Sequence, residues 1–238
     1  MGRALIVGDV HGCAAELDAL LEQLAVGDGD QLVFVGDLVA RGPDSRRVLR
    51  CLRELGARSV VGNHEERLLA ARDARSRGEP GPRLGPAHRR VFDELDGADW
   101  ALLESLPLSI DLPEHDLRVV HAGVVPGVPF DEQDPWLLTH IRTIDAEGIP
   151  SHRFGGAPWG ARYVGGPHVV FGHNARLAPQ LHPHATGLDT GCVYGGRLTA
   201  LVLGEGEKLP PVAERAEALS SVPARQTYVD YGGKLRAG

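Results

Sequence analysis

Short apolar runs recur along the first third of the chain and give the first indication of its fold. Residues 3–7, 31–35 and 58–61 are each rich in Val or Ile, and each run is followed by Gly and a polar residue. Runs of this length that end at a glycine are typical of buried strands. We therefore predict strands at these three positions.

Helical patterns lie between and after these strands. Residues 13–25 repeat leucine at helical spacing, and residues 43–56 have Pro43 and Gly56 where the first turn and the end of a helix favour them. A further helix is expected at 64–78. The chain thus begins with a β-α-β-α-β order, followed by a third helix.

The second half of the chain is richer in strands. Residues 87–106 indicate one or two helices, and we expect an insertion over roughly 77–106 to cap the sheet. Residues 124–167 are weakly patterned, with a short helix expected within 130–144. The later predicted strands span 108–112, 117–123, 168–174, 185–191 and 197–203, with a last edge strand at 226–231.

This order of elements favours an α/β protein with a single domain over residues 1–238. Alternating units followed by a run of strands fit one mixed sheet or two packed sheets, with helices outside. The chain has 42% hydrophobic and 24% charged residues, which is ordinary for a globular protein. A wholly disordered or fibrous chain is therefore excluded.

Charge and composition also limit the partners. The net charge of −7 argues against binding to a nucleic-acid duplex or an anionic membrane, because both attract an excess of Lys and Arg. No apolar stretch approaches the roughly 20 residues that cross a bilayer, and no signal-peptide pattern is present, so we expect a cytoplasmic protein. The three cysteines are expected to stay reduced, and the chain to be a monomer or small homo-oligomer. The basic segment 72–90 is interpreted as a solvated loop, with a role in holding phosphates left open.

Polar side chains with metal-binding chemistry follow the ends of the predicted strands. The carboxyl ends of strands in an α/β sheet converge on one crevice, so such residues meet despite their separation in sequence. Flanking glycines allow the tight turns that aim side chains into a small volume. The residues concerned are Asp9, His11, Asp37, Asn63, His64, His121 and His173.

The mixture of ligand types points to transition metals. Carboxylate, amide oxygen and imidazole together suit Mn²⁺, Fe or Zn²⁺ better than Ca²⁺ or Mg²⁺. Asp37 can bridge two cations, and a metal pair stabilises the attacking and leaving oxygens in phosphate-ester hydrolysis. Arg41 is placed to bind two phosphate oxygens, and His64 to act as general acid for the leaving group. We therefore expect two divalent transition-metal ions, with manganese ahead of iron, zinc or cobalt.

Each of these residues alone has an ordinary structural explanation. An Asp-x-His turn commonly caps backbone N–H groups, an asparagine commonly serves a turn, and a lone histidine is commonly a satisfied core residue. Their joint occurrence in this order favours the metal site. The other histidines lack that context and are interpreted as surface residues or as residues behind the ligands: His88, His115, His140, His152, His168, His182 and His184.

The motifs GDVHG, GDLVARG, GNHE, HAG and GHN, spread over residues 9–174, resemble the phosphoprotein-phosphatase branch of the calcineurin-like metallophosphoesterase superfamily. That resemblance implies a sandwich of two mixed β-sheets flanked by helices, and a hydroxide between two metals that attacks phosphorus in line. Many members of the superfamily carry a second histidine where this chain has Ala175. The absence of that histidine is the pattern of the phosphoprotein-phosphatase branch. The implied ligands are Asp9, His11 and Asp37 for one metal, and Asp37, Asn63, His121 and His173 for the other.

The resemblance also implies catalytic roles. His64 would protonate the leaving group, and Arg41 would bind phosphate together with Arg142, which lies in a segment without a sharp motif. Ser/Thr protein phosphatases typically carry GDxVDRG, whose second aspartate orients the catalytic histidine. This chain has Ala40 at that place, so His64 lacks its usual carboxylate partner.

Two stretches indicate the substrate. Symmetrical diadenosine tetraphosphatases are similar in carrying GDLVARGP and a late LDTGC-x-WGG-x-LT run, and this chain has LDTGCVYGGRLT with Tyr194 in place of the tryptophan. The chemistry agrees, because a nucleoside diphosphate leaves more readily than an alkoxide and depends less on a proton from His64.

The sequence therefore predicts a binuclear-metal hydrolase, of bacterial origin by resemblance, that cleaves diadenosine tetraphosphate to two ADP. A Ser/Thr protein phosphatase or a broad-specificity phosphomonoesterase uses the same metals and is the alternative for a phosphorylated substrate. A catalytically inactive protein that keeps the fold is a third hypothesis, against which the intact metal motifs argue.

Overall fold

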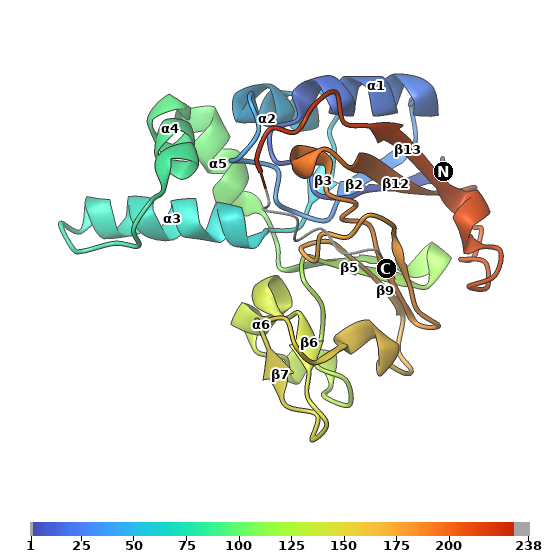
Figure 1. Cartoon of the computed structure of the whole chain (residues 1–238). Helices are drawn as coiled ribbons and strands as arrows, with labels where there is room; N and C mark the ends of the chain where they lie inside the picture. The colour runs from blue at the N-terminus through green and yellow to red at the C-terminus, as the bar shows by residue number, and fades with distance from the viewer. Residues whose placement is uncertain (1, 231–238) are drawn as a thin grey trace.

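Two five-stranded β-sheets pack face to face at the centre of the computed structural model, which describes residues 2–230 (Figure 1). Both sheets mix parallel and antiparallel pairs, as the resemblance implies. The first sheet has the order β13 (Leu219–Pro223), β12 (Arg197–Leu203), β1 (Ala4–Val7), β2 (Gln31–Phe34) and β3 (Arg58–Ser59). The second has the order β10 (Gln180–Leu181), β11 (Ala185–Gly187), β9 (His168–Phe171), β5 (Leu117–Val120) and β4 (Ser109–Leu112).

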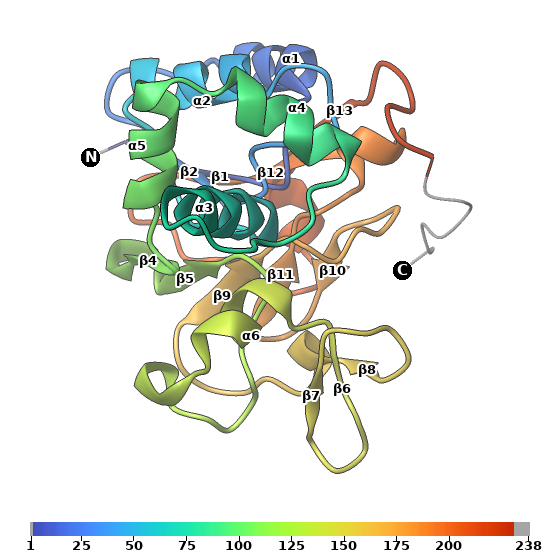
Figure 2. The same ribbon diagram turned by 90° about the vertical axis from the view of Figure 1, so that its left-hand side faces the viewer.

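Helices cover the outer face of the first sheet and extend to one side of it (Figures 1 and 2). α1 (Ala14–Leu24) and α2 (Ser45–Glu54) share an apolar cluster with the strands of this sheet. α3 (Asn63–Ser76) begins directly at the end of the third strand. Beyond it, α4 (Pro86–Glu94) and α5 (Gly97–Ser105) pack against α2 and α3, so the stretch predicted to hold one or two helices holds two.

Apolar layers on both faces explain why β1 is a continuous hydrophobic run. Leu5 and Val7 pack in the cluster that contains α1 and α2, whereas Ala4 and Ile6 pack in the cluster between the two sheets. Alternate side chains of a strand point to opposite faces, so a strand that is covered on both sides needs no polar alternation.

A separate lobe covers the outer face of the second sheet. It contains α6 (Pro135–His140), which confirms the short helix expected within 130–144. A third sheet in the same lobe, with strand order β7 (Pro150–Ser151), β6 (Thr143–Ile144) and β8 (Ala157–Pro158), was not predicted. Its two-residue strands are too short to leave an apolar pattern in the sequence.

The predicted start of α2 is wrong by two residues. Asp44 is the N-cap, and its side chain accepts a hydrogen bond from the N–H of Arg47 at 2.9 Å. Pro43 therefore precedes the helix and does not occupy its first turn. The predicted C-terminal signal is confirmed, because Gly56 follows the helix with a φ of 59°.

The expected edge strand at 226–231 is also wrong for its described part, since residues 226–230 contain no strand. The hydroxyl of Tyr228 donates to Glu16 on α1 at 2.8 Å, and the N–H groups of Tyr228 and Val229 both donate to the carbonyl of Val193. These contacts hold the segment against a helix and a loop, so it forms no ladder with a neighbouring strand. The final strand lies earlier, at β13. Residue 231 lies outside the described residues.

Short 3₁₀ helices connect several of these elements. They are η1 (Pro113–His115), η2 (Phe130–Glu132), η3 (Trp159–Ala161), η4 (Cys192–Tyr194) and η5 (Arg215–Ala218). No helix within residues 2–230 is both long and apolar enough to cross a bilayer.

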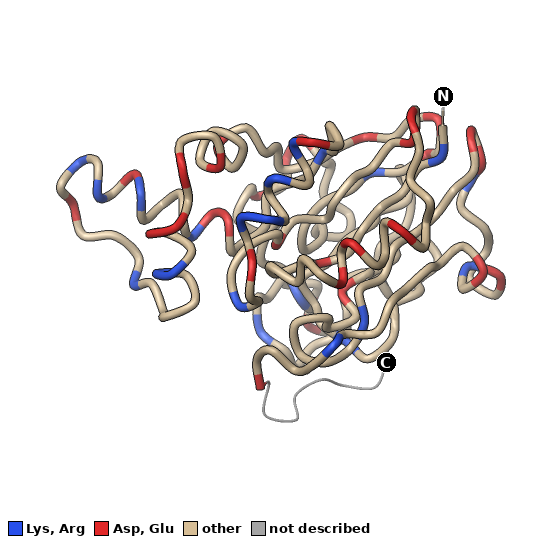
Figure 3. Tube along the Cα trace, turned by 90° about the horizontal axis from the view of Figure 1, so that it is seen from above, with Lys and Arg blue, Asp and Glu red and all other residues tan. Residues whose placement is uncertain are grey.

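Charges of both signs are interspersed over the molecule (Figure 3). Within the basic segment, Arg72 pairs with Glu104, and Arg77 pairs with Asp73 and Glu79. These ion pairs are exposed, so they contribute little to stability, but they neutralise much of the local positive charge. The pairing supports the interpretation of this segment as a solvated surface.

Candidate metal centre and active site

The loops that follow the strands of the two sheets are hydrogen-bonded to one another. His11, after β1, donates its N–H to the carbonyl of Asp37, after β2, at 2.8 Å. The N–H of His64 donates to the Asp37 carboxylate at 3.0 Å. In the second sheet, Gly172 donates its N–H to the carbonyl of His121 at 2.7 Å. Within each sheet, neighbouring strand ends are therefore joined by hydrogen bonds.

The backbone of this region is strained. Of the seven described non-glycine residues with positive φ, five belong to these loops. Side chains other than glycine rarely adopt this conformation, and such strain concentrates at functional sites. The five residues are His11, Asp37, Ala40, Arg41 and His173.

Buried side chains meet in two groups with the spacing of metal ligands, and Asp37 belongs to both. One group joins Asp37 to His11 and His64, and the other joins Asp37 to His121 and His173, with all ligand atoms of a group within 4.8 Å of one another. A carboxylate has two oxygens, so a residue at this position can bind two cations at once.

Asn63 completes the second group. Its Oδ1 lies 3.1 Å from Nε2 of His121 and 2.9 Å from Nδ1 of His173. Oδ1 of Asp37 lies 3.4 Å from the same Nε2 of His121. Several lone-pair-bearing atoms therefore converge on one small volume, and a cation at their centre would satisfy all of them.

Backbone carbonyls set the tautomers of two of the histidines. Nδ1 of His121 lies 2.8 Å from the carbonyl of Val35, and Nδ1 of His11 lies 3.3 Å from the carbonyl of Val39. A carbonyl only accepts, so each Nδ1 carries a proton and each Nε2 faces the site. This orientation by a group behind the ligand is usual for metal-bound histidine.

The electrostatics of the metal-free side chains also fit a cation. Burial, helped by the carboxylate of Asp189, raises the pKa of Asp9 well above its ordinary value. Burial would raise the pKa of Asp37 too, but His121 and His64 beside it hold that pKa well below its usual range. Burial would lower the pKa of His121, but the Asp37 carboxylate raises it to about 10. A proton on His121 thus balances the charge of Asp37, which is what a divalent cation between them would do.

Asp9 belongs to neither of the two ligand groups that the described residues form. Its carboxylate accepts the N–H of His173, at 2.9 Å to Oδ2 and 3.2 Å to Oδ1. The contact joins the first strand to the loop after β9, and it requires the glycine before that histidine. A Cβ atom at Gly172 would lie 1.9 Å from Oδ1 of Asp9. The structure thus brings Asp9 to the site without placing it among the closest ligand atoms.

Glu65 was missed by the sequence reasoning, although it is the last residue of the GNHE motif. It is completely buried, and its carboxylate accepts three backbone N–H groups, those of Gly62 and Asp37 at 2.9 Å and that of Val39 at 3.1 Å. One side chain therefore fixes both the start of α3 and the strained turn that carries Asp37. The sequence signal was a Glu at the third position of a helix, which is a capping-box pattern.

Among residues 2–230, none forms a hydrogen bond with the buried Nδ1 of His64. Ala40 supplies no carboxylate, and its own N–H donates to Oγ of Ser45 at 3.0 Å. The predicted lack of the usual partner is therefore confirmed. The ring of His64 instead lies between two other rings, with His11 edge-on and His88 stacked at an interplanar angle of 24°, each centroid 4.7 Å away.

His88 is thus closer to the site than the sequence indicated. It comes from α4, in the stretch predicted to be an insertion, and is half-buried against His64. Burial lowers the pKa of His64 well below its ordinary value and that of His88 to about 4, so both rings are neutral. No sequence motif predicted this contact, because it depends on how α4 packs over α3.

Arg41 belongs to one of the stretches that indicated the substrate and contacts the other. Its side chain donates to Nε2 of His11 at 2.9 Å. Its guanidinium carbon lies 5.4 Å from the centre of the ring of Tyr194, in the LDTGCVYGG loop. Aromatic rings favour a cation at this distance. The position of Tyr194 thus keeps this guanidinium at the edge of the ligand group.

Arg142 also lies beside the ligands. It donates to the carbonyl of His173 at 3.1 Å and to Oδ1 of Asn174 at 2.9 Å. The ring of Phe154 covers its guanidinium at 4.7 Å. Asn174, the last residue of the GHN motif, therefore holds an arginine, a contact that the sequence reasoning did not foresee.

Most of the remaining histidines are not ligands in this arrangement. His115 is buried, and its Nδ1 lies 2.6 Å from the carbonyl of Glu207, so the expectation of a residue at the surface or behind the ligands is wrong. The cause is the turn that contains Glu207, which lies against η1. His140 lies beside His173, with ring centroids 6.3 Å apart, in agreement with a position behind the ligands.

Comparison with known proteins agrees with this geometry. The family model for calcineurin-like phosphoesterase matches residues 2–200. A symmetrical bis(5'-nucleosyl)-tetraphosphatase from Chromohalobacter salexigens is 34% identical, covering 84% of this chain and 94% of that protein. The asymmetrical bis(5'-nucleosyl)-tetraphosphatase PrpE from Halalkalibacterium halodurans is 31% identical, covering 94% of this chain and 95% of that protein.

Solved structures share the fold. A crystal structure described as that of a candidate diadenosine tetraphosphatase has 36% sequence identity and a TM-score of 0.78, covering 98% of this chain and 95% of that one. A serine/threonine phosphatase from Saccharomyces cerevisiae has 16% identity and a TM-score of 0.58, covering 97% and 81%, and shares the fold alone. The match to residues 2–200, taken with the two buried ligand groups, shows that the chain belongs to the calcineurin-like phosphoesterase family.

Proposed function

We propose that this chain is a binuclear-metal hydrolase that cleaves diadenosine tetraphosphate symmetrically into two molecules of ADP. The observation that carries the proposal is the position of Asp37 in both ligand groups, which is what a pair of bridged cations requires. The symmetrical tetraphosphatase at 34% identity supports the choice of substrate.

The ligand set fits two divalent transition metals, with manganese as the first choice. Bound there, they would stabilise negative charge on phosphate oxygens and activate water. His11, Asp37 and Asp9 would hold one ion. The second ion would be held by Asp37 again and by three further residues: Asn63, His121 and His173.

His64 is proposed to protonate the departing nucleotide. The free ring is neutral because burial lowers its pKa, and a bound polyphosphate brings the negative charge that favours the protonated form. Without a carboxylate at position 40, His64 is a weakly supported acid. Such an acid suits an anhydride, whose leaving group needs little protonation, better than a phosphoserine ester.

Two arginines are proposed to bind the phosphates. Arg41 and Arg142 lie on opposite sides of the ligand groups, one against His11 and the other against His173. Each side chain is covered by an aromatic ring, so its planar fork is held ready for phosphate oxygens. We also propose that residues 77–106 act as a cap on a single domain, because His88 of α4 reaches the ring of His64.

Asymmetrical cleavage into ATP and AMP is a second candidate. The PrpE relative covers nearly all of this chain at 31% identity, so the comparisons favour a tetraphosphate substrate more strongly than one particular bond. A Ser/Thr protein phosphatase shares the ligand set, but the missing support of His64 argues against it.

Product analysis separates these functions. Protein loaded with Mn²⁺ is incubated with diadenosine tetraphosphate, and in parallel with a phosphoserine peptide, and the products are separated by anion-exchange chromatography. ADP alone, with the peptide largely intact, supports the proposal. Equal amounts of ATP and AMP would show asymmetrical cleavage and overturn the proposal. Fast release of phosphate from the peptide would overturn it in favour of a protein phosphatase. Fewer than one metal ion per chain after reconstitution, with no turnover, would favour an inactive protein.

A further inference from the structure

A cavity of about 190 Å³ opens directly beside the metal centre, between α3 and α6. A larger cavity, between α3 and α4, is lined by none of the candidate ligands. The smaller cavity beside α6 is lined by Asn63. A molecule bound at the metals therefore has direct access to it. The cavity is lined by Asn63, Glu66, Arg67, Ala70, Pro82, Trp136 and His140.

A series of aromatic rings leads from the metal centre along this cavity. The ring of His140 lies 6.3 Å from that of the candidate ligand His173. Trp136 stacks on His140 with centroids 4.4 Å apart and planes within 10° of parallel, and His152 meets Trp136 edge-on at 5.5 Å. Trp136 remains 46% exposed, although the two other tryptophans of the chain are buried. A large, exposed, pre-oriented ring beside a phosphate site is a platform for another flat ring.

A hydrogen bond fixes the platform relative to the ligands. The hydroxyl of Thr139, on α6, donates to Oε2 of Glu66, on α3, at 2.9 Å. The helix that carries Trp136 is therefore joined to the helix that begins at the candidate ligand Asn63. The distance between the ring and the metal centre is thus set by two helices and does not depend on a flexible loop.

The opposite wall supplies a positive charge. Arg67 donates to the backbone carbonyl of Arg83 at 3.2 Å, and within residues 2–230 no carboxylate forms an ion pair with it. Most of the guanidinium donors therefore remain available to a ligand in the cavity. A cation, an aromatic face and a candidate metal ligand around one cavity match the parts of a nucleotide.

We propose that this cavity is a nucleoside subsite, in which the base of a nucleoside polyphosphate stacks on Trp136 while Arg67 binds a phosphate between the base and the metals. The inference rests on the proposed function, and it assigns one of the two nucleosides of the substrate to the lobe that carries α6. Selectivity for a nucleotide over a simple phosphate then comes from Trp136.

Binding measurements on the metal-loaded enzyme test the subsite separately from catalysis. Isothermal titration compares ADP with methyl diphosphate, which carries the same phosphates without a nucleoside, so chelation of the metal affects both ligands alike. We expect wild-type protein to bind ADP about 5- to 150-fold more tightly, the range of one base–aromatic stack. Trp136→Ala should abolish that preference, and Trp136→Phe should keep most of it. Leu55→Ala, which removes an exposed apolar side chain at the end of α2, is the matched control.

Two further measurements give independent readouts. Arg67→Gln should weaken ADP and methyl diphosphate by the same factor of about ten, whereas Arg50→Gln on the outer surface of α2 should change neither. ADP should also protect the fluorescence of the protein from acrylamide quenching, because Trp136 is the exposed tryptophan, and methyl diphosphate should protect it much less.

The subsite and the proposed function can fail separately. Equal affinity for ADP and methyl diphosphate in the wild-type protein, or an unchanged preference in Trp136→Ala, would overturn the subsite even if diadenosine tetraphosphate is cleaved to ADP. A preference for ADP that depends on Trp136, in a protein that leaves the dinucleotide intact, would retain the subsite and overturn the proposed function.

Discussion

The two walls of the site are built in different ways. One wall consists of the strand-end loops, in which side chains are buried and held by backbone groups, as Glu65 holds the turn of Asp37. The other wall is the lobe over residues 124–167, which has one short helix, strands of two residues and exposed rings such as Trp136 and Phe154. The first wall holds its side chains by buried hydrogen bonds, and the second offers exposed surface to a ligand.

This difference suggests a division of labour. Metal chemistry depends on ligand positions, so it is placed where β-sheets and buried hydrogen bonds leave little freedom. Recognition of a substrate tolerates variation, so it is placed on short elements that can differ among relatives without disturbing the sheets.

The largest expected effect comes from removing Asp37 from the first wall. Asp37→Ala takes a carboxylate from both ligand groups, so we expect turnover of diadenosine tetraphosphate to fall by at least about 10³-fold, the equivalent of the several kcal/mol that metal ions contribute. Metal content, measured by mass spectrometry, should fall below two ions per chain. Asp28→Ala, an exposed carboxylate between α1 and β2, is the control. Wild-type turnover by Asp37→Ala would remove the basis of the bridged pair.

A smaller effect should follow from Glu65→Gln, which leaves every candidate ligand in place. The amide of Gln turns one acceptor into a donor, so it cannot accept all three N–H groups that Glu65 binds. We expect metal affinity to fall by about 10- to 100-fold through misplacement of Asp37, measured by competition with a chelator.

Its control is Glu54→Gln, on the exposed end of α2. If Glu65→Gln binds metal as tightly as the wild-type protein, the first wall does not depend on this buried carboxylate, and the contrast between the two walls is weaker than the structure indicates.

The first wall was also the part that could be predicted from sequence. Its strands are continuous apolar runs, and each ends in a glycine-flanked ligand such as Asp9 or His121, so fold and chemistry gave the same signal. Asn63 and His173, 110 residues apart, could be assigned to one site because both follow the carboxyl ends of strands, which converge on one crevice.

Apart from its helix α6, the second wall could not be predicted, for a physical reason. Trp136 gains its place from the hydrogen bond between Thr139 and Glu66 and from stacking on His140, and none of these contacts leaves a periodic pattern. Strands of two residues are likewise too short to show an alternation of apolar and polar side chains. The part of the site that depends on tertiary packing of short elements therefore appeared only in the structure.

His88 tests whether the insertion contributes a third wall. His88→Ala removes the ring stacked on His64, and a stack of this kind is worth about 0.5–1.5 kcal/mol, so turnover should fall by about 2- to 12-fold. The loss should be greater for an aryl phosphate with a poor leaving group than for diadenosine tetraphosphate, because only the former depends strongly on protonation by His64.

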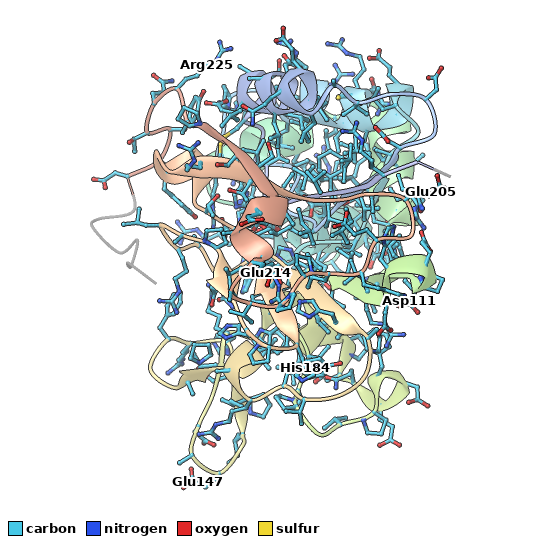
Figure 4. The ribbon with its side chains drawn as sticks, turned by 90° about the vertical axis from the view of Figure 1, so that its right-hand side faces the viewer. Asp111, Glu147, His184, Glu205, Glu214 and Arg225 are labelled. Atoms are coloured by element: carbon cyan, nitrogen blue, oxygen red, sulfur yellow. The ribbon has the colours of Figure 1, made fainter. Side chains whose placement is uncertain are left out.

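His88→Phe keeps a ring and should restore most of the activity, while His184→Ala, at an exposed position on the opposite face (Figure 4), should have no effect. An equal loss with both substrates would indicate that His88 supports the fold of α4 and not the orientation of His64.

The smallest effect concerns the far end of β9, where His168 is half-buried away from the site. Oγ1 of Thr186 accepts an N–H from Arg215 at 3.2 Å and lies 2.9 Å from Nε2 of His168, to which the hydroxyl donates when that nitrogen is unprotonated. Burial, and then the charges of Arg215, His184 and His182, lower the pKa of His168 to about 3.

The unfolded chain has an ordinary histidine pKa of about 6.5, so between pH 6.5 and 3 it binds more protons at this position than the folded chain does. His168 therefore stabilises the fold above pH 6.5, and this contribution is lost as the pH falls, by about 1.4 kcal/mol for each unit below 6.5. His168→Gln keeps a polar group beside Thr186 and cannot gain the charge. Urea unfolding of the metal-loaded protein at pH 7.0 and 5.5 should show a smaller loss of stability in the variant, by about 1 kcal/mol. Equal losses in the two proteins would mean that His168 is protonated in the fold.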